Sequence, residues 1–517
     1  MQAAGIFEDQ TEMIKVGPFI LDDYQERSIP ALRAEFAKGH DRVVLCAPTG
    51  SGKTICSLAI EQMCIEAGTR VAFITSGRQL IFQKAQKAKE AGLNFSVLMG
   101  ASHFEWDPDA DLLIVSKDTL TARYGKNLSW REPDLLIVDE CDVAKSDVWI
   151  EILERSPRTI GLTATPITSQ GQPLPFYEAM VEVASYSELI RSGRLVDVPL
   201  GNLFSPYRPS LKGGEVSNGD WNTRWLGGRM NRPKLVGDIV DHWQKYGEGR
   251  PTICFCTNKA HTASVCDAFN GAGVAAAFIV DDTPQADRKE IFEATERGDN
   301  TVIVNCQTLT RGFDLPMLSC CILARPSKSL RLILQMVGRV LRASPGKEDA
   351  MILDHSGAIL DVLGWPTEDR VWSIDPNSDM EGLQDESRKE SNTKSPDRLC
   401  GSCKRVMFAS MKRCPFCGYE KVLAASMAET EDGKLVRVRK KGKKKGPPTE
   451  SEALKRKWGG IMARFGKSNL PYKSAATVFH RETGKWPENA GLPWTVQRAD
   501  WDTKIAVLFP WTVRGKK

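Results

Sequence analysis

The chain of 517 residues contains no run of about 18 apolar residues, the length that a membrane-spanning helix needs. Its first residues, Met1 to Gly17, are mixed and partly acidic, and they lack the pattern of a secretory signal. We therefore expect no membrane partner and a cytoplasmic location. The length and a hydrophobic content of 41% allow about three domains, each with a core of its own.

The sequence also gives little indication of disulfides, although it contains 14 cysteines. Ten of them are scattered, many in apolar stretches, and we interpret these as reduced residues of a core. The ten are Cys46, Cys56, Cys64, Cys141, Cys254, Cys256, Cys266, Cys306, Cys320 and Cys321. The other four form a separate group near the end of the chain and are considered below.

Net charge is low, at +5, but the charges are unevenly distributed. Residues 394–517 contain 28 basic and 11 acidic side chains, a net charge of +17, so the rest of the chain carries −12. A basic tail on an acidic body indicates a polyanionic partner, because contacts with phosphates dominate nucleic-acid affinity. Charge that only improves solubility is the alternative interpretation.

The segment Ala47-Pro48-Thr49-Gly50-Ser51-Gly52-Lys53-Thr54 follows an apolar run and precedes a helical pattern. In such a strand, loop and helix, backbone N–H groups close around a phosphate and the lysine neutralises the β- and γ-phosphate oxygens. The predicted nucleotide contacts are Thr49, Gly50, Ser51, Gly52 and Lys53, and the Thr54 hydroxyl can ligate Mg²⁺. A glycine-rich turn without a ligand is the alternative. The pattern predicts a user of ATP or GTP.

Apolar runs alternate with helical stretches from residue 43 to 162 and again from 252 to 355. This alternation predicts an α/β fold with two lobes, each a parallel sheet with crossover helices. Only the first lobe has a phosphate loop. The expected boundaries are 1–200 for the first lobe, 201–230 for a connector, 231–374 for the second lobe and 375–396 for a flexible, polar linker.

Two carboxylates follow the aliphatic run Leu135 to Val138. Asp139 and Glu140 are thereby predicted at the carboxyl edge of the first sheet, where ligands bind. Asp139 is suited to hold Mg²⁺, and Glu140 could orient the attacking water or accept its proton. Acidic residues after a strand also serve simply to solvate a loop, which is the alternative.

The second lobe contains Gln335, Arg339 and Arg342, spaced at i, i+4 and i+7. This spacing predicts that the three side chains share one helix face. Guanidinium groups supplied across an interface stabilise the charge of the transferred phosphoryl group. We therefore predict catalytic roles for these three residues together with Lys53 and Glu140. An exposed basic stripe is the alternative.

Taken together, these segments resemble the helicase superfamily 2 motors of the DExD/H type over residues 19–372. The resemblance implies two RecA-like lobes that clamp ATP between them, and it implies an ATP hydrolase acting as a DNA helicase. The matching segments, in the order of the family motifs, are Tyr24-Gln25, 47–54, 76–80, 116–120, 139–142, 163–166, 254–259, 310–316 and 335–342.

Further roles are implied by the resemblance alone. Gln25 would contact adenine, Gly312 would belong to the nucleotide site and Asp314 would lie near the ribose. The segment that matches motif III of the family, Thr163 to Pro166, would couple hydrolysis to lobe movement. Segments 76–80, 116–120, 254–259 and 310–316 would contact the nucleic-acid backbone.

This chain has Gln335 followed by Met336. The Asp-Glu-Ala-Asp RNA helicases share a His-Arg pair in the corresponding place. With the segment Gly312 to Pro316, this difference makes the chain similar to phage-type and restriction-type DNA helicases. The sequence thus favours DNA over RNA as the partner. An RNA helicase, or the motor subunit of a restriction or repair complex, is the alternative. The intact set of nucleotide-site residues disfavours a non-enzymatic scaffold.

Cys400-x₂-Cys403 and Cys414-x₂-Cys417 are separated by ten residues, the spacing of a tetrahedral Zn²⁺ site. Four thiolates leave no open coordination position, so the metal would be structural, and a redox pair is the weaker alternative. We expect a zinc ribbon over 397–420. The basic residues of this ribbon are suited to binding nucleic acid, and binding a partner protein is an equally simple function for it.

The end of the chain is the least informative part. Lys434 to Lys445 carries eight basic residues, so we predict a basic linker over 421–450. Aromatic residues recur from Trp458 to Trp511 among basic ones, and we predict a small, helical, basic domain over 451–517. A hydrophobic core explains these aromatic residues better than base stacking does, although both remain open.

Overall fold

The computed structural model describes residues 14–100, 106–124, 126, 132–143, 147–168, 171–205, 209–217, 219–306, 313–380, 383–384, 398–408 and 410–420, with Trp458, Ile461, Phe479, His480 and Thr483. The chain divides into two compact units, 1–423 and 424–517. Within the described residues, no helix has the length and the apolar character that crossing a membrane requires.

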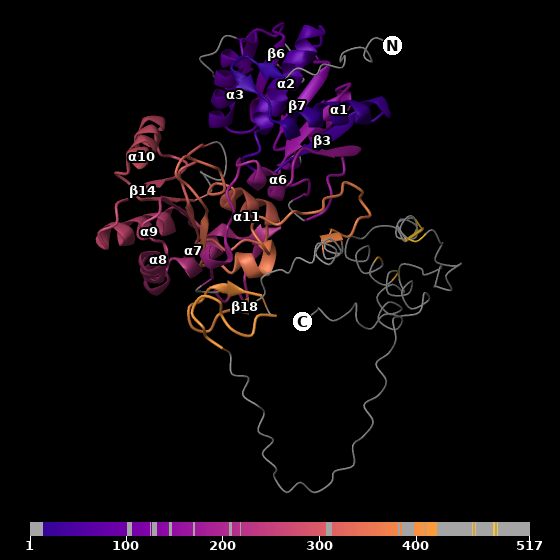
Figure 1. The fold of residues 1–517 in the computed structure, drawn as a ribbon. Coiled ribbons are helices and arrows are strands. Elements are labelled where there is room, and N and C mark those ends of the chain that lie inside the picture. Colours follow the sequence, from indigo (N-terminus) through magenta and orange to yellow (C-terminus); the bar gives the residue numbers. More distant parts are fainter. Residues whose placement is uncertain are drawn as a thin grey trace, which may run out of the picture. The chain divides into compact units, whose positions relative to one another are not determined.

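Lobe 1 is built on a sheet of seven strands, all of them parallel (Figure 1). In spatial order they are β5 (Phe95–Leu98), β6 (Leu112–Ser116), β4 (Val71–Thr75), β7 (Leu135–Asp139), β8 (Thr159–Thr163), β3 (Arg42–Cys46) and β9 (Ala179–Glu182). The helices are α1 (Asp23–Ala37), α2 (Lys53–Glu66), α3 (Arg78–Glu90), α4 (Lys117–Arg123), α5 (Asp147–Arg155) and α6 (Tyr186–Arg191), with a short pair β1 (Lys15–Val16) and β2 (Phe19–Ile20).

Lobe 2 is a second parallel sheet, of six strands. In spatial order they are β10 (Leu203–Phe204), β17 (Met351–Asp354), β16 (Cys320–Leu323), β13 (Thr252–Phe255), β15 (Val302–Asn305) and β14 (Ala276–Ile279). Its helices are α7 (Thr223–Met230), α8 (Pro233–Tyr246), α9 (Lys259–Gly271), α10 (Gln285–Arg297) and α11 (Leu330–Val337), and a π-helix spans Ile359–Leu363.

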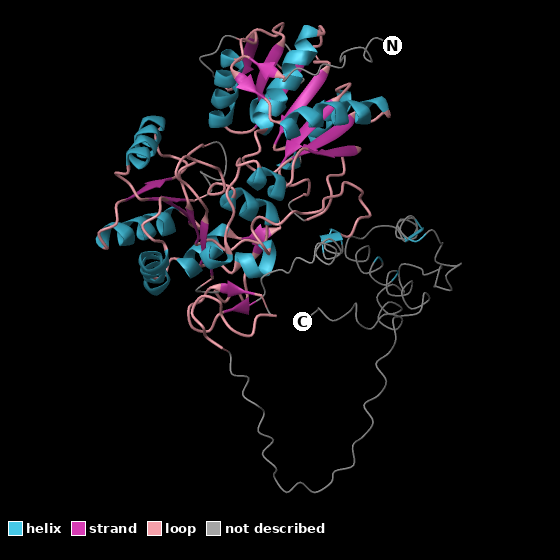
Figure 2. Ribbon diagram, viewed as in Figure 1, coloured by secondary structure: helices cyan, strands magenta, loops and turns pink. Residues whose placement is uncertain are grey.

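Both sheets are buried on both faces, as Figure 2 shows by helices (cyan) on either side of the strands (magenta). Along β3, Val43 and Leu45 pack into one hydrophobic cluster, whereas Val44 and Cys46 pack into another. The alternation of side chains along a strand explains this division. Crossover helices cover both faces, so these strands contain continuous apolar runs instead of alternating ones. The predicted fold class of two parallel α/β lobes is confirmed.

The segment between the lobes contributes more structure than its composition indicated. Leu203–Phe204, which we assigned to the connector, forms the edge strand β10 of the second sheet and pairs in parallel with β17. The connector also contains the hairpin of β11 (Val216–Ser217) and β12 (Asp220–Trp221). A two-residue edge strand is too short to be recognised from apolar periodicity.

The four-cysteine segment folds around a short antiparallel pair, β18 (Arg398–Leu399) and β19 (Val406–Met407). It packs on the edge of lobe 2, where the Arg405 Nε donates a hydrogen bond to the Gly201 carbonyl at 2.9 Å. The Arg405 guanidinium contacts the rings of Phe204 and Phe416, 5.1 and 4.7 Å from their centroids. These contacts join the ribbon to lobe 2 beside β10.

In the second unit, Trp458 and Phe479 are fully buried and meet edge to face, with ring centroids 5.2 Å apart. These two aromatic residues belong to a core, as we expected. The other aromatic residues of this unit, all of the predicted linker 421–450 and most of the linker 375–396 lie outside the described residues.

Candidate functional site

The phosphate loop connects β3 to α2, and α2 begins at Lys53. Gly50 and Gly52 have φ angles of +94° and +78°, a region that L side chains rarely adopt, so both positions favour glycine. A Cβ atom on Gly52 would lie 2.4 Å from the Gln25 Nε2. The loop is therefore held in a fixed, tight conformation.

Lys53 folds back over this loop, and its Nζ donates hydrogen bonds to the carbonyls of Ala47 at 2.8 Å and Pro48 at 3.2 Å. Burial lowers the pKa of Lys53, while the charges of Glu140 and Asp139 act in the opposite direction. The ammonium group thus lies near the loop carbonyls and the two carboxylates, in a position to bind a phosphate group of a nucleotide.

Gln25 lies on α1 and is 3% exposed. Its Nε2 donates to the Ser51 carbonyl at 3.0 Å, and its Oε1 accepts from the Asp22 N–H at 2.9 Å. The Tyr24 hydroxyl donates to the same Ser51 carbonyl at 3.0 Å. In this arrangement Gln25 supports the phosphate loop, and its role toward adenine stays a prediction.

Asp139 and Glu140 stand at the carboxyl end of β7, as predicted from the sequence. Thr75, at the end of neighbouring β4, donates its hydroxyl to the Asp139 Oδ2 at 3.3 Å. Burial and the charge of Glu140 raise the pKa of Asp139 to about 6. Glu140 has a φ of +51°, which is uncommon for a residue with a side chain and marks a constrained backbone at this edge.

Gln335 connects the two lobes at this point. Its Nε2, on α11 of lobe 2, donates a hydrogen bond to the Glu140 Oε2 of lobe 1 at 2.7 Å. Gln335 is 4% exposed, whereas Glu140 is only partly buried. The structure thereby brings together a side chain from each lobe, 195 positions apart in the sequence.

The prediction that Gln335, Arg339 and Arg342 share one helix face is wrong. Helix α11 ends at Val337 with Gly338 as its C-cap, so only Gln335 is helical. A Cβ atom on Gly338 would lie 2.8 Å from the Thr49 Cβ, so the chain passes too close to the phosphate loop for a larger residue. Beyond this point Arg342 forms a β-bridge with Leu195, an extended pairing that replaces the helix.

The two arginines instead converge on one carbonyl. Arg339 and Arg342 each donate from Nη1 to the Phe313 carbonyl at 3.0 Å, and Arg342 also pairs with the Asp314 carboxylate. Arg342 still lies beside the phosphate loop, because its Cγ is 3.4 Å from the Cβ position of Gly50. Gly312, a predicted nucleotide contact, lies outside the described residues.

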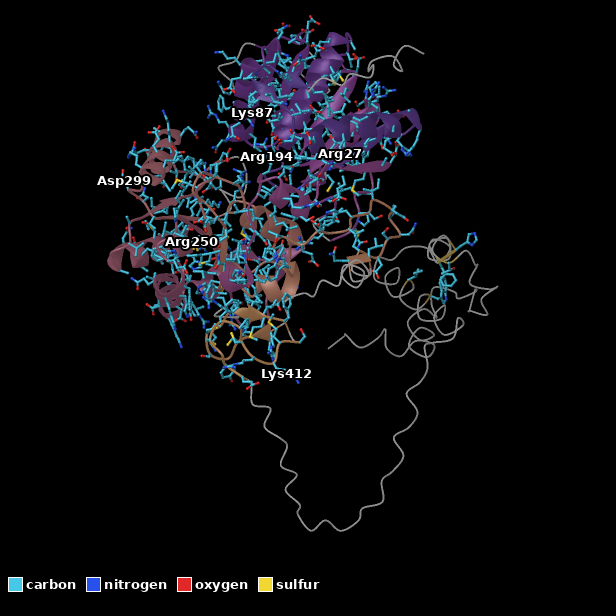
Figure 3. All side chains as sticks on the ribbon, in the orientation of Figure 1. Arg27, Lys87, Arg194, Arg250, Asp299 and Lys412 are labelled. Carbon is cyan, nitrogen blue, oxygen red and sulfur yellow. The ribbon has the colours of Figure 1, made fainter. Side chains whose placement is uncertain are left out.

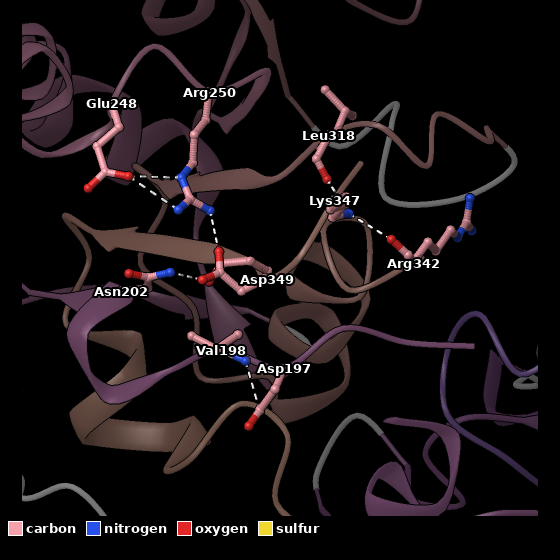
Figure 4. A network of polar contacts seen from close by, with 10 residues as sticks. Asp197, Val198, Asn202, Glu248, Arg250, Leu318, Arg342, Lys347 and Asp349 are labelled. Carbon is pink, nitrogen blue, oxygen red and sulfur yellow. Dashed lines mark hydrogen bonds and ion pairs between the residues drawn. The ribbon is translucent and has the colours of Figure 1, made fainter. Parts of the chain in front are cut away.

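Lys347 was not identified from the sequence, yet it organises this part of lobe 2 (Figure 4). Its Nζ donates to three carbonyls, of Pro316 at 2.9 Å, Leu318 at 2.6 Å and Arg342 at 2.7 Å. It therefore ties the segment after Asp314 to the segment that carries Arg342. A lysine in a loop gives no pattern that predicts such a role.

A buried ion pair in lobe 1 was also missed. The Lys84 Nζ on α3 lies 2.6 Å from the Glu61 Oε1 on α2, and neither side chain is more than 2% exposed. Lys84 also donates to the Ser57 hydroxyl at 2.9 Å and lies 4.1 Å from the Phe73 ring centroid. The only signal in the sequence is a charged residue within the apolar face of each helix.

Cys400, Cys403, Cys414 and Cys417 converge, with all four Sγ atoms within 4.8 Å of one another. Two of the separations are 3.5 Å, Cys400 to Cys417, and 3.7 Å, Cys403 to Cys414. Zinc–thiolate bonds of about 2.3 Å in a tetrahedron place sulfur atoms about 3.8 Å apart. The donor set and its dimensions are consistent with a zinc site.

A phosphate loop on one parallel-sheet lobe, met by side chains of a second such lobe, defines the class of two-lobe P-loop motors. The sequence matches two protein-family models. Residues 19–168 match the family described as type III restriction enzyme, res subunit, and residues 232–344 match the helicase conserved C-terminal domain. These segments coincide with most of lobe 1 and lobe 2. The chain belongs to the superfamily 2 helicases.

Relatives of this chain include proteins of a phage and of a yeast. A 51.5 kDa protein of Lactococcus phage (isolate 7-9) is 27% identical over 382 residues, which cover 72% of this chain and 77% of the relative. IRC3 of Saccharomyces cerevisiae, named as a proposed ATP-dependent helicase, is 25% identical, and the match covers 71% of this chain and 56% of that protein. The chain thus spans little more than half the length of the yeast relative.

Among solved structures, a fragment of a proposed HsdR subunit of a type I restriction enzyme from Vibrio vulnificus YJ016 is 20% identical. The comparison has a TM-score of 0.49 and covers 65% of this chain and 64% of the fragment.

Proposed function

We propose that this protein is an ATP-dependent translocase or helicase that acts on DNA. The observation that carries the proposal is the hydrogen bond of 2.7 Å from the Gln335 Nε2 to the Glu140 Oε2, because it joins the lobes at the acidic end of β7. Hydrolysis at a site made by two lobes changes how the lobes fit together. Such a change is what a motor needs to step along a strand.

ATP fits the residues of the phosphate loop. The tight loop of Gly50 and Gly52 presents backbone N–H groups, and Lys53 supplies a positive charge to the β- and γ-phosphates. Thr54 and Asp139 offer the oxygen donors that Mg²⁺ prefers, and a cation there would offset the repulsion between Asp139 and Glu140. Bound Mg²⁺ would neutralise charge on the phosphates.

Glu140 is the proposed residue that orients the attacking water or accepts its proton. The amide of Gln335 fixes the position of this carboxylate. We assign Arg339 and Arg342 to stabilise the developing phosphoryl charge, for which both would leave the Phe313 carbonyl when nucleotide binds. An arginine of this kind raises hydrolysis by about 10³- to 10⁵-fold in other phosphate-loop enzymes.

DNA is the proposed track for two reasons. The match of lobe 1 to a restriction-enzyme subunit and the sequence of the second lobe both favour the DNA-directed group. The basic residues of 394–517 add affinity for phosphates, and exposed Lys412 on the ribbon belongs to this set (Figure 3). A structural Zn²⁺ held by the four cysteines would keep the ribbon folded.

The test is the ATPase rate of the full chain with single-stranded DNA, duplex DNA, branched DNA or RNA. We expect stimulation by at least one DNA and little by RNA, and Lys53→Ala should abolish ATP binding and with it the rate. Lys38→Ala, which removes an exposed lysine of the same lobe, is the matched control. Stimulation by RNA alone would replace DNA by RNA as the track, and ATP hydrolysis unaffected by Lys53→Ala would refute the nucleotide site.

A further inference from the structure

A second polar contact joins the lobes one helical turn before Gln335. The Arg331 Nε, in the first turn of α11, lies 2.9 Å from the Oδ2 of Asp142 in lobe 1. The Asp142 side chain is fully buried and that of Arg331 is 19% exposed. On its other oxygen, Asp142 accepts a hydrogen bond from the Thr163 hydroxyl at 3.4 Å. An ion pair thus crosses the interface between the lobes in a place that excludes water.

This ion pair lies next to the Gln335–Glu140 contact of the candidate active site. Arg331 and Gln335 are four residues apart on α11, so both side chains leave the same face of the helix. Their partners, Asp142 and Glu140, are two residues apart in the segment that directly follows β7. Helix α11 therefore meets this acidic segment at two successive turns, once by an ion pair and once by the hydrogen bond that orients Glu140.

We propose that Arg331 is a positioning residue that holds α11 on the acidic segment when the lobes are closed, so that Gln335 reaches Glu140. This inference rests on the proposed function and extends it to a residue outside the family motifs. A buried carboxylate requires a charged partner, because burial without one carries a large desolvation penalty. Closing the lobes buries Asp142 against Arg331, whereas opening them exposes both groups to water. The pair therefore favours the closed state over the open one.

Asp142 also links this contact to motif III, the segment Thr163 to Pro166. Thr163 lies at the end of β8, and its hydroxyl reaches the Asp142 carboxylate directly. A movement of Asp142 relative to Arg331 would therefore also displace its hydrogen-bond partner Thr163, at the start of the segment from Thr163 to Pro166. The ion pair connects the helix of lobe 2 with two neighbouring strand ends of lobe 1.

The test compares Arg331→Met with Arg331→Lys and with the control Arg42→Met. Arg42 forms an ion pair with Glu178 at 2.8 Å, with side chains 28% and 37% exposed, but both residues belong to lobe 1. We expect Arg331→Met to lower kcat about 10-fold or more, the size of a typical coupling between two sites, with the Kd for ATP changed less than about threefold. Arg331→Lys should restore part of kcat, and Arg42→Met should leave kcat unchanged.

Amide hydrogen exchange of 330–338 and 135–143, with and without a non-hydrolysable ATP analogue, supplies a readout independent of turnover. The analogue should protect both segments in the parent and in Arg42→Met, and clearly less in Arg331→Met. A double-mutant cycle combines Arg331→Met with Asp142→Asn. The double variant should lose no more kcat than the worse single variant, because the two residues act as one unit. Additive losses, or parental kcat and protection in Arg331→Met, would overturn the proposal.

These readouts separate the inference from the proposed function. If the parent did not hydrolyse ATP with any nucleic acid, the proposed function would fail. Protection by the analogue that depends on Arg331 would still support the positioning role. If the parent hydrolysed ATP as proposed while Arg331→Met was protected normally, only the positioning role would fail.

Discussion

The two lobes share a parallel sheet covered on both faces, but they present functional groups in different ways. Lobe 1 carries the phosphate loop as one contiguous segment, 47–54, fixed by glycines with positive φ and by Gln25. Lobe 2 has no such loop and contributes separate side chains from the end of α11 and the extended segment after it. A binding site made by backbone needs a local sequence, whereas one made by side chains needs only tertiary contacts.

This difference leads to the largest predicted effect. Glu140→Gln in lobe 1 should lower ATP turnover about 10²- to 10⁴-fold, the usual contribution of a general base, while ATP binding persists. Gln335→Ala in lobe 2 should cost less, about 10- to 100-fold, because it only loosens the position of Glu140. Single-turnover hydrolysis together with nucleotide binding checks both. Parental turnover in Glu140→Gln would mean that another group activates the water.

The comparison of the lobes also explains what the sequence could predict. The two parallel sheets and the phosphate loop followed from contiguous apolar runs and glycine spacing, and the four cysteines from a spacing specific to metal sites. The short edge strand β10 and the end of α11 at Val337 did not. Both depend on partners far away in the chain, Met351–Asp354 for β10 and Thr49 and Leu195 for the end of α11.

The same limit applies to Lys84, Lys347 and Arg331. Each is a cation whose role is defined by an oxygen atom more than 20 positions away, or in the other lobe. No local pattern separates Lys347 or Arg331 from an exposed lysine or arginine, and Lys84 shows only its place within the apolar face of a helix. Residues of this kind are found only once the tertiary structure is known.

The buried ion pair of lobe 1 predicts a large effect on stability. Lys84→Met leaves the Glu61 carboxylate buried without its partner, which should cost about 3–5 kcal/mol of unfolding free energy. Adding Glu61→Leu should recover most of this loss, because an apolar pair of similar size is tolerated. Denaturation monitored by amide exchange in α2 and α3 checks the result.

Lys38→Met removes an exposed partner of Glu35 in the same lobe, so its effect should stay within about 1 kcal/mol. If Lys84→Met and Lys38→Met were equally stable, the buried pair would contribute nothing beyond a surface pair. The contrast between the two variants therefore measures the effect of burial on one kind of interaction.

In lobe 2 the corresponding test concerns position instead of stability. Lys347→Met removes the donor shared by the carbonyls of Pro316, Leu318 and Arg342, so the backbone at Arg342 should shift. Turnover should fall about 10-fold, as expected for a modest displacement of a catalytic group, with ATP binding to lobe 1 unchanged. Lys289→Met on α10, where the lysine side chain is 76% exposed, is the control. Equal turnover in the two variants would argue against this role of Lys347.

The smallest predicted effect concerns acid, to which buried imidazoles make lobe 2 sensitive. His261 is fully buried on α9, its Nδ1 lies 3.0 Å from the Thr257 hydroxyl, and burial lowers its pKa to about 4. Because this pKa lies below the ordinary value near 6.5, the stability gained from neutral His261 is complete above pH 6.5. It is lost as the pH falls toward about 4.

Between pH 7 and 4.5 the melting temperature of lobe 2 should therefore fall by a few °C more in the parent than in His261→Gln, which cannot titrate. His40→Gln in lobe 1 removes a half-exposed imidazole and should leave the difference unchanged. Amide exchange of β13 and α9, compared with that of β3 and α2, assigns the loss to its lobe. An equal acid response in the parent and in His261→Gln would show that burial of this imidazole does not set the acid sensitivity of lobe 2.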